Sequence, residues 1–178
     1  MSGIEEVRTR VSVGSGAWEK PLGDVLEFMR LLWAVDHRLK STSKRMEATM
    51  GITGPQRLVL RLVGRFPGIT AGRLARILLV HPSTITGILR RLEERHYLTR
   101  GSDPLDRRKA LFSLTEKGRA LDVPSDHTVE AAVQRLLTRL PKAQLAVAQE
   151  VFTVLAAELG SENAPDDDAP GEPEPALG

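Results

Sequence analysis

Apolar residues recur at helical spacing through much of the chain. Between residues 21 and 48 they fall three or four positions apart, which predicts one long helix. The positions are Leu22, Val25, Leu26, Met29, Leu32, Trp33 and Leu39. Together they form more apolar surface than one small core needs, so we expect this helix to pack against a partner helix.

A second helical pattern begins after residue 52. Thr53 can cap the helix while the Gln56 side chain returns the bond, Pro55 suits the first turn, and Pro67-Gly68 ends the pattern. The apolar side chains expected to face inward are Leu58, Val59, Leu62, Val63 and Phe66.

Two more short helices follow. "ITAGRLARIL" begins at a capping Thr70, and we expect Leu74, Ile77 and Leu78 to be buried. The next helix covers 83–95, with Pro82 in its first position. Its inward face consists of Ile85, Ile88, Leu89 and Leu92.

The hydrophobic period changes after residue 95. "YLTR" and "KALFSLT" are typical of short strands, and "GSDPLDRR" between them has the Gly and Pro of a turn. This predicts a β-hairpin. Thr115 then caps a helix that runs through Leu121, and helices are expected over 127–140 and 142–159.

This order of elements predicts the fold class. Two short helices with a tight turn, followed by a charged two-stranded hairpin, make a winged helix-turn-helix. We therefore expect a mostly α fold with a small β-hairpin wing and a further helical region.

The length and composition of the chain indicate one domain with a tail at each end. The chain has 178 residues, which suits one domain with tails: 1–20, Gly/Ser-rich toward its end, is expected to be flexible. Residues 161–178 hold six acidic residues and no basic one, and are expected to be disordered. No segment has the length of uninterrupted apolar sequence that a membrane span needs. The chain has no cysteine, which excludes disulfides and thiolate metal sites, and a cytoplasmic protein is the plain interpretation.

Positive charge is concentrated in the middle of the chain. Residues 57–109 contain twelve Lys and Arg against four acidic residues, a net charge of +8. Such a concentration is typical of a protein that binds a polyanion, although a solvated surface without a partner would have the same charge.

The helix over 83–95 and the hairpin carry the candidate contacts to double-stranded DNA. The outer face of the helix is small and rich in hydroxyls, which suits entry into the major groove, and Arg90 follows one turn later. The hairpin tip carries Arg107 and Arg108, which suit phosphate or the minor groove. The candidate contacts are Ser83, Thr84, Thr86, Gly87, Arg90, Arg107 and Arg108. The alternatives are that the hydroxyls only cap the helix and that the hairpin arginines are only solvated.

Several segments resemble the MarR (multiple antibiotic resistance regulator) family of transcriptional regulators. They are "ITGPQRLVL", "TAGRLARIL", "STITGILRRLEER", "DRR" at 106–108 and "LFSLTEKGRAL" at 111–121. The resemblance covers about 21–160 as a single domain. It implies a winged helix-turn-helix over 53–115 and a homodimer formed by the helices of 21–48 and 116–160.

The same resemblance implies functions for particular residues. The chain would be a transcriptional repressor that binds a pseudo-palindromic operator. Asp106 would orient a wing arginine by a charge-assisted hydrogen bond. A small aromatic or lipophilic effector would bind between the dimer helices and the winged module, where Trp33 and His37 are the candidate ligand residues. Trp33 at such a position is more often a core residue.

The chain departs from the family's pattern at three places. Gly87 stands where an arginine is frequent, His96 stands where a glycine usually ends the helix, and Pro82 is unusual beside the turn. A non-glycine residue at position 96 must adopt a left-handed conformation or end the helix in another way.

Other classes of function find little support. There is no glycine-rich phosphate loop, no cysteine nucleophile and no pairing of carboxylates with a histidine, so we expect neither an enzyme nor a cofactor. The four histidines lack metal-ligand spacing, so no metal site is expected. The alternative is a winged-helix module that binds protein. DNA binding would weaken steeply with salt, whereas protein binding would not.

Overall fold

The computed structural model describes residues 21–104 and 106–161 of the 178-residue chain. The segment 1–20 and the acidic tail, apart from Ser161, lie outside these residues, so the expectations of flexibility and disorder are not addressed. Contacts divide the described chain into two compact units, one that ends at Arg139 and one that begins at Leu140.

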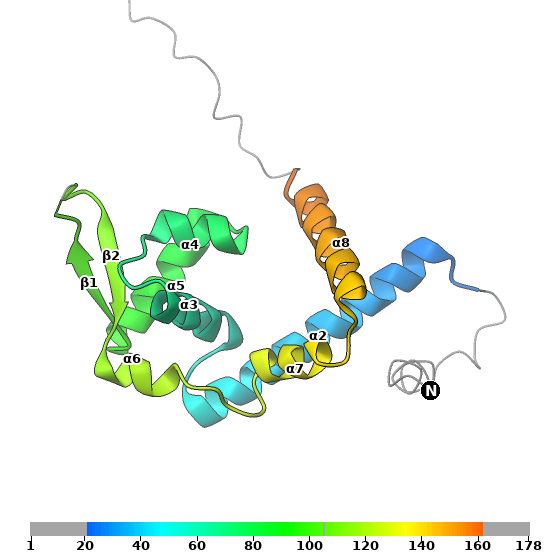
Figure 1. The fold of residues 1–178 in the computed structure, drawn as a ribbon, viewed down its shortest axis with the longest axis horizontal. Coiled ribbons are helices and arrows are strands. Elements are labelled where there is room, and N and C mark those ends of the chain that lie inside the picture. Colours follow the sequence, from blue (N-terminus) through cyan, green and yellow to red (C-terminus); the bar gives the residue numbers. More distant parts are fainter. Residues whose placement is uncertain (1–20, 105, 162–178) are drawn as a thin grey trace, which may run out of the picture. The chain divides into compact units, whose positions relative to one another are not determined.

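The elements confirm the expected fold class. The first unit contains α2 (Asp24–Met50), α3 (Gly54–Arg65), α4 (Ala71–Leu78), α5 (Pro82–Glu94), β1 (Leu98–Ser102), β2 (Ala110–Leu114), α6 (Glu116–Leu121) and α7 (Val129–Leu137) (Figure 1). The second unit contains α8 (Lys142–Ser161). The helix expected over 127–140 is shorter than predicted, because Thr128 caps α7 and His127 before it has a φ of 63°.

Local sequence signals set the helix ends as expected. Thr53 and Gln56 form a complete capping box at the start of α3. Thr70 accepts a hydrogen bond from the Arg73 N–H, and Thr115 accepts one from the Gly118 N–H. His96 has a φ of 60°, so it adopts the left-handed conformation after α5 that a glycine would take without strain.

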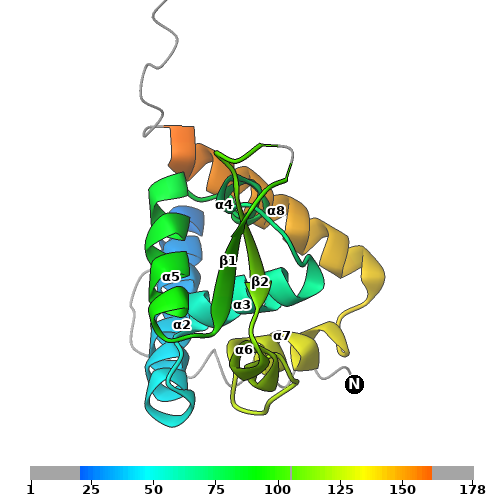
Figure 2. The same ribbon diagram turned by 90° about the vertical axis from the view of Figure 1, so that its left-hand side faces the viewer.

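The hairpin forms a two-stranded antiparallel sheet. Leu98 pairs with Leu114 at one end and Ser102 with Ala110 at the other. Figure 2 shows α5 beside β1, with α6 at the end of the hairpin that is remote from its turn. A bridge between Ile69 and Phe112 ties β2 to the segment before α4. The wing is therefore fixed to the helix-turn-helix.

The core lies under α5. Its buried side chains include Val59, Leu60 and Val63 of α3, Leu74 and Ala75 of α4, Ile85, Leu89 and Leu92 of α5, and Tyr97, Leu98 and Phe112 of the hairpin. This confirms the inward face predicted for α5, where Ile88 is partly buried against the same core.

Three of the burial predictions are wrong. Leu58, Phe66 and Ile77 are exposed by 51%, 37% and 42%. Helical spacing identifies the side of a helix that packs, but not its width, and this small module covers only a narrow stripe of each short helix.

Two helices keep much of their apolar surface exposed. In α2 the only buried side chain is Met46. Its exposed apolar side chains are Val25, Leu26, Phe28, Met29, Leu31, Trp33, Val35 and Leu39. In α8 they are Val147, Val151, Phe152, Val154 and Leu159. None of the described helices combines the length and apolar character that crossing a bilayer requires.

Candidate nucleic-acid interface

The first turn of α5 presents hydroxyl groups to solvent. Pro82 occupies its first helical position, as expected, and the cap is His81, which the sequence did not indicate. The Ser83 N–H donates to His81 Nδ1 at 3.3 Å, and Ser83 Oγ lies 2.7 Å from the same nitrogen. Because His81 supplies the cap, neither Ser83 nor Thr84 is needed as the capping residue.

Ile85, Leu89 and Leu92 hold α5 against the core and turn its opposite side outward. Thr86 is exposed there, and its hydroxyl donates to the Pro82 carbonyl at 3.0 Å, which leaves the oxygen free to accept. Gly87 has open space around it, since a Cβ built there would meet no atom within 4 Å.

The Arg90 side chain lies on the same outward side, one turn after Thr86. It is 73% exposed, and its Nε is 3.6 Å from Glu94 Oε1. An exposed pair of this kind is worth about 0–1 kcal/mol. The guanidinium is therefore available to another anion at small cost.

Asp106 organises the turn of the hairpin. Its Oδ1 accepts hydrogen bonds from the Arg108 N–H at 3.1 Å and from Arg108 Nε at 3.2 Å. Lys109 Nζ lies 3.5 Å from the other carboxylate oxygen. The backbone N–H of Arg108 and then its guanidinium lower the pKa of Asp106, so the carboxylate stays ionised. Asp106 thus contacts Arg108, while the Arg108 side chain remains 92% exposed.

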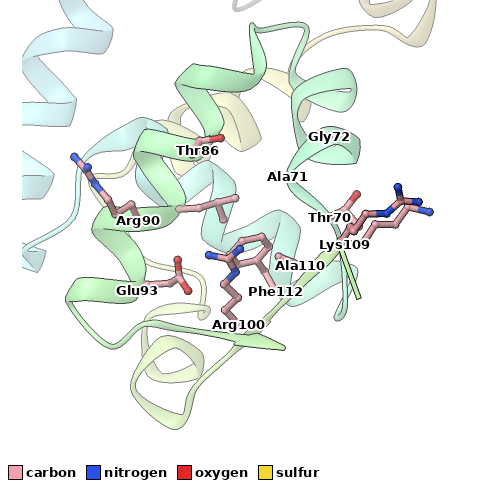
Figure 3. Close-up of a pocket in the computed structure, with 12 residues that line it drawn as sticks. Thr70, Ala71, Gly72, Thr86, Arg90, Glu93, Arg100, Lys109, Ala110 and Phe112 are labelled. Atoms are coloured by element: carbon pink, nitrogen blue, oxygen red, sulfur yellow. The ribbon is translucent and has the colours of Figure 1, made fainter. Parts of the chain in front are cut away.

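A groove of about 540 Å³ lies between α5 and the hairpin. Its lining brings together Thr86 and Arg90 of α5 with Arg108 and Lys109 of the hairpin. Thr70, the N-cap of α4, also lines the groove, and Figure 3 shows it beside Lys109, across the view from Arg90. The other predicted contacts, Ser83, Thr84, Gly87 and Arg107, do not line this groove but lie on exposed or partly exposed surface.

Arg100 also lines the groove, and the sequence analysis did not single it out. It pairs with Phe112 across the hairpin and lies two residues beyond the buried Leu98. Figure 3 shows the Arg100 side chain directed toward α5 and Glu93 of α5 directed into the groove. Alternation along β1 would have placed Arg100 on this face, had the pairing register been known.

The groove and the outer side of α5 form one surface. On it the arginine side chains of α5 and the hairpin lie around the small hydroxyl side chains of α5. Arginine forks suit phosphate oxygens and guanine edges, and hydroxyls donate to or accept from base edges. The arrangement is chemically suited to a polyanion whose bases are accessible in a groove.

Trp33 and His37, the candidate ligand residues, lie elsewhere, on α2. Trp33 is 74% exposed, so within the described chain it is not a core residue, and His37 is also exposed. Within 21–104 and 106–161, no group of three or more His, Cys, Asp or Glu residues is arranged to hold a metal ion.

Comparison with known proteins gives consistent matches. The sequence matches the family model described as "MarR family" over residues 50–109. It is 31% identical over 132 residues to the HTH-type transcriptional repressor Rv2887 of Mycobacterium tuberculosis, a match that covers 74% of this chain and 92% of that protein.

The fold also resembles solved structures. The Streptococcus pneumoniae FabT structure in complex with DNA superposes with a TM-score of 0.59 at 21% identity, over 79% of this chain and all of that one. The crystal structure of MarR superposes with a TM-score of 0.54 at 27% identity, over 81% of this chain and 94% of that one.

Proposed function

The chain belongs to the MarR family of DNA-binding transcriptional regulators, and we propose that it is a homodimeric repressor that binds a pseudo-palindromic operator in double-stranded DNA. The observation that carries this proposal is the surface on which the outer side of α5 and the arginines of the hairpin meet. Two comparisons support it: the relative Rv2887 is named a transcriptional repressor, and the FabT structure is a complex with DNA.

The start of α5 would enter the major groove. Its small side chains let the helix backbone approach the bases closely, and the contacts proposed there are Ser83, Thr84, Thr86 and Gly87. Arg90 would exchange its exposed pair with Glu94 for guanine O6 and N7 or for a phosphate.

The wing would contact the backbone and the minor groove beside it. Arg107 and Arg108 are exposed at the hairpin turn, and Asp106 would hold Arg108 in an extended position before DNA arrives. Phosphate contacts fix the register of the protein, while base contacts select the sequence.

The exposed apolar side chains of α2 and α8 support a homodimer. Large exposed patches on a protein of this size are typical of interaction surfaces, and the expected partner is a second copy of the chain. Sedimentation should therefore give a dimer, and a stable monomer at micromolar concentration would contradict the proposal.

A small aromatic or lipophilic anion is the proposed effector class. Trp33 and His37 are exposed on α2 of the single chain, so an effector site there would need the partner subunit to complete it. Thermal shift against a panel of aromatic acids tests this, and the absence of any shift, with DNA binding unchanged, would favour a regulator without such a ligand.

Selection of bound duplexes from random DNA tests the main proposal. We expect enrichment of two inverted half-sites about 10–10.5 bp apart. Binding to the selected duplex should weaken steeply as salt increases. No enriched sequence, together with binding that does not depend on salt, would instead favour a winged-helix module that binds protein.

A further inference from the structure

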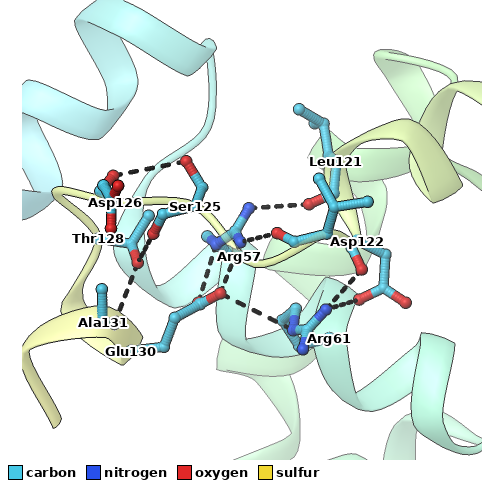
Figure 4. Close-up of polar contacts among 10 residues, drawn as sticks. Arg57, Arg61, Leu121, Asp122, Ser125, Asp126, Thr128, Glu130 and Ala131 are labelled. Carbon is cyan, nitrogen blue, oxygen red and sulfur yellow. Dashed lines mark hydrogen bonds and ion pairs between the residues drawn. The ribbon is translucent and has the colours of Figure 1, made fainter. Parts of the chain in front are cut away.

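Arg57 of α3 is a buried cation that the proposed DNA contacts do not use. Its side chain is 1% exposed, and four hydrogen bonds join its guanidinium to partners outside α3 (Figure 4). Nε and Nη2 donate to the two carboxylate oxygens of Glu130 at 2.8 and 2.5 Å. Nη1 donates to the Leu121 carbonyl at 2.8 Å, and Nη2 also donates to the Val123 carbonyl at 2.7 Å.

Two further positions on the same face of α3 extend this contact. Arg61, one turn after Arg57, donates to the backbone and side-chain oxygens of Asp122 and lies 3.8 Å from Glu130. Gly64 follows, and a Cβ there would lie 2.2 Å from Asp122 Oδ2. The face formed by residues 57, 61 and 64 therefore lies against residues 121–123, and a side chain at 64 would force the Asp122 carboxylate to move.

We call the contacts of Arg57 and Arg61 with Glu130, Asp122 and the carbonyls of 121 and 123 the α3 clamp. It ties α3 to residues 121–123 and to the start of α7, in addition to the direct packing of α3 against α2. On its other side α3 packs in the core beneath α5, whereas Glu130 lies in the first turn of α7, which contacts α2. We call the winged helix-turn-helix, from α3 through the hairpin, the recognition module. The clamp thus connects the recognition module to α7, which in turn contacts α2.

The module has a second connection at the end of α2. Gly51 turns the chain with a φ of 68°, the Arg95 side chain donates to its carbonyl, and the Gly54 N–H donates to Ser43 Oγ at 2.9 Å. A module held at one corner can still rotate about it. A second attachment removes that rotation, and the planar, two-pronged guanidinium of Arg57 defines direction as well as distance.

We propose that the α3 clamp fixes the angle of the recognition module against α2 and α7, and so sets the half-site spacing that the dimer accepts. This inference rests on the proposed function, because a spacing exists only for a dimer that binds two half-sites. Arg57, Arg61 and Glu130 are then positioning residues that touch no DNA. They act through the position of α5.

The test uses the full chain and duplexes built from the selected half-site. Centre-to-centre spacings run from about 9 to 13 bp, and a duplex with one half-site serves as reference. The variants are Arg57→Lys, which keeps the charge but loses the fork, and Glu130→Gln, which keeps the shape but loses the charge. Asp122→Asn removes only the charge that pairs with Arg61, and it provides a milder variant should either of the others fail to fold.

Val63→Ala is the matched control, because Val63 is buried in the core beside α5 and makes none of the clamp's hydrogen bonds or ion pairs. We expect the clamp variants to bind the single half-site as the wild type does. Their preference for the best spacing over its neighbours should fall about fivefold or more, a size typical of coupling between sites. Val63→Ala should keep the wild-type spacing preference even if its melting temperature falls as far as that of the clamp variants.

The outcomes separate the two proposals. If the wild type prefers one spacing and the clamp variants keep that preference while losing thermal stability, the clamp is only structural and the inference is wrong. If the wild type binds two half-sites no better than one at any spacing, the proposed dimeric binding fails and the inference fails with it.

Discussion

Removing the two arginines of the wing should change the salt dependence of DNA binding more than its sequence preference. The variant is Arg107→Ala/Arg108→Ala. Arg107 makes no side-chain hydrogen bond or ion pair with any residue of 21–104 or 106–161, and Arg108 holds only Asp106 while 92% exposed. Both guanidiniums are therefore available to phosphate at small cost.

The structure allows the size of the effect to be worked out. Each phosphate contact contributes about 0.9 to the slope of log K against log salt concentration on B-DNA. Two arginines in each of two wings give about 3.6 for the proposed dimer. Between 50 and 200 mM salt, the advantage of the wild type over the variant should then shrink about 150-fold.

Fluorescence anisotropy over this salt range, with selected and scrambled duplexes, measures both slopes. Arg38→Ala/Lys44→Ala removes the same charge from exposed positions on α2 outside the proposed DNA contacts, and its effect on affinity and slope should be small. Equal affinity and equal slope for the wing variant and the wild type would refute a wing contact and leave the hairpin as a solvated loop. If a wing arginine occupies the minor groove, its loss should matter more where the flank is A·T-rich.

Three further predictions concern stability and are measured by chemical denaturation. Gly118→Ala should destabilise by about 1–3 kcal/mol, because its Cβ would lie 2.1 Å from the Tyr97 carbonyl oxygen, and unchanged stability would contradict this packing. Leu79→Gly should raise the free energy of unfolding by about 0.5–1 kcal/mol, because Leu79 is 70% exposed and its φ of 53° suits glycine better than a residue with a Cβ. Leu79→Val should lower it. Arg57→Met should cost about 2–4 kcal/mol, less than for a fully buried pair because Glu130 is 37% exposed, and Glu130→Leu in that background should restore part of the loss.

The sequence predicted best the features that depend on near neighbours. The capping box of Thr53 and Gln56 and the caps Thr70 and Thr115 all involve contacts within a few residues. At His96 the sequence left two outcomes open, and the structure has the left-handed one. The inward face of α5 was also predicted, because one side of that helix is apolar and the other polar. The element order and the fold class follow from these local signals.

Features that depend on distant neighbours could not be predicted in the same way. Arg57 stands between Gln56 and Leu58, and its burial depends on Glu130, 73 residues away. Arg100 reaches the groove through the register of the hairpin, which the turn sets. The cap of α5 was missed for a different reason: histidine is not among the usual capping residues, although an unprotonated Nδ1 can accept the same hydrogen bond.

The structure also changes what the charge of the middle segment means. Of the twelve basic residues in 57–109, Arg57 and Arg61 belong to the α3 clamp, and their acidic partners, Asp122 and Glu130, lie outside that segment. A count along the sequence assigns these two charges to a polyanion partner, although they are balanced within the fold. The cations proposed to contact DNA are those around α5 and the hairpin, chiefly Arg90, Arg100 and the arginines of the wing. The proposed DNA-binding surface therefore carries less positive charge than the net charge of residues 57–109 suggests, because two of those charges are paired within the fold.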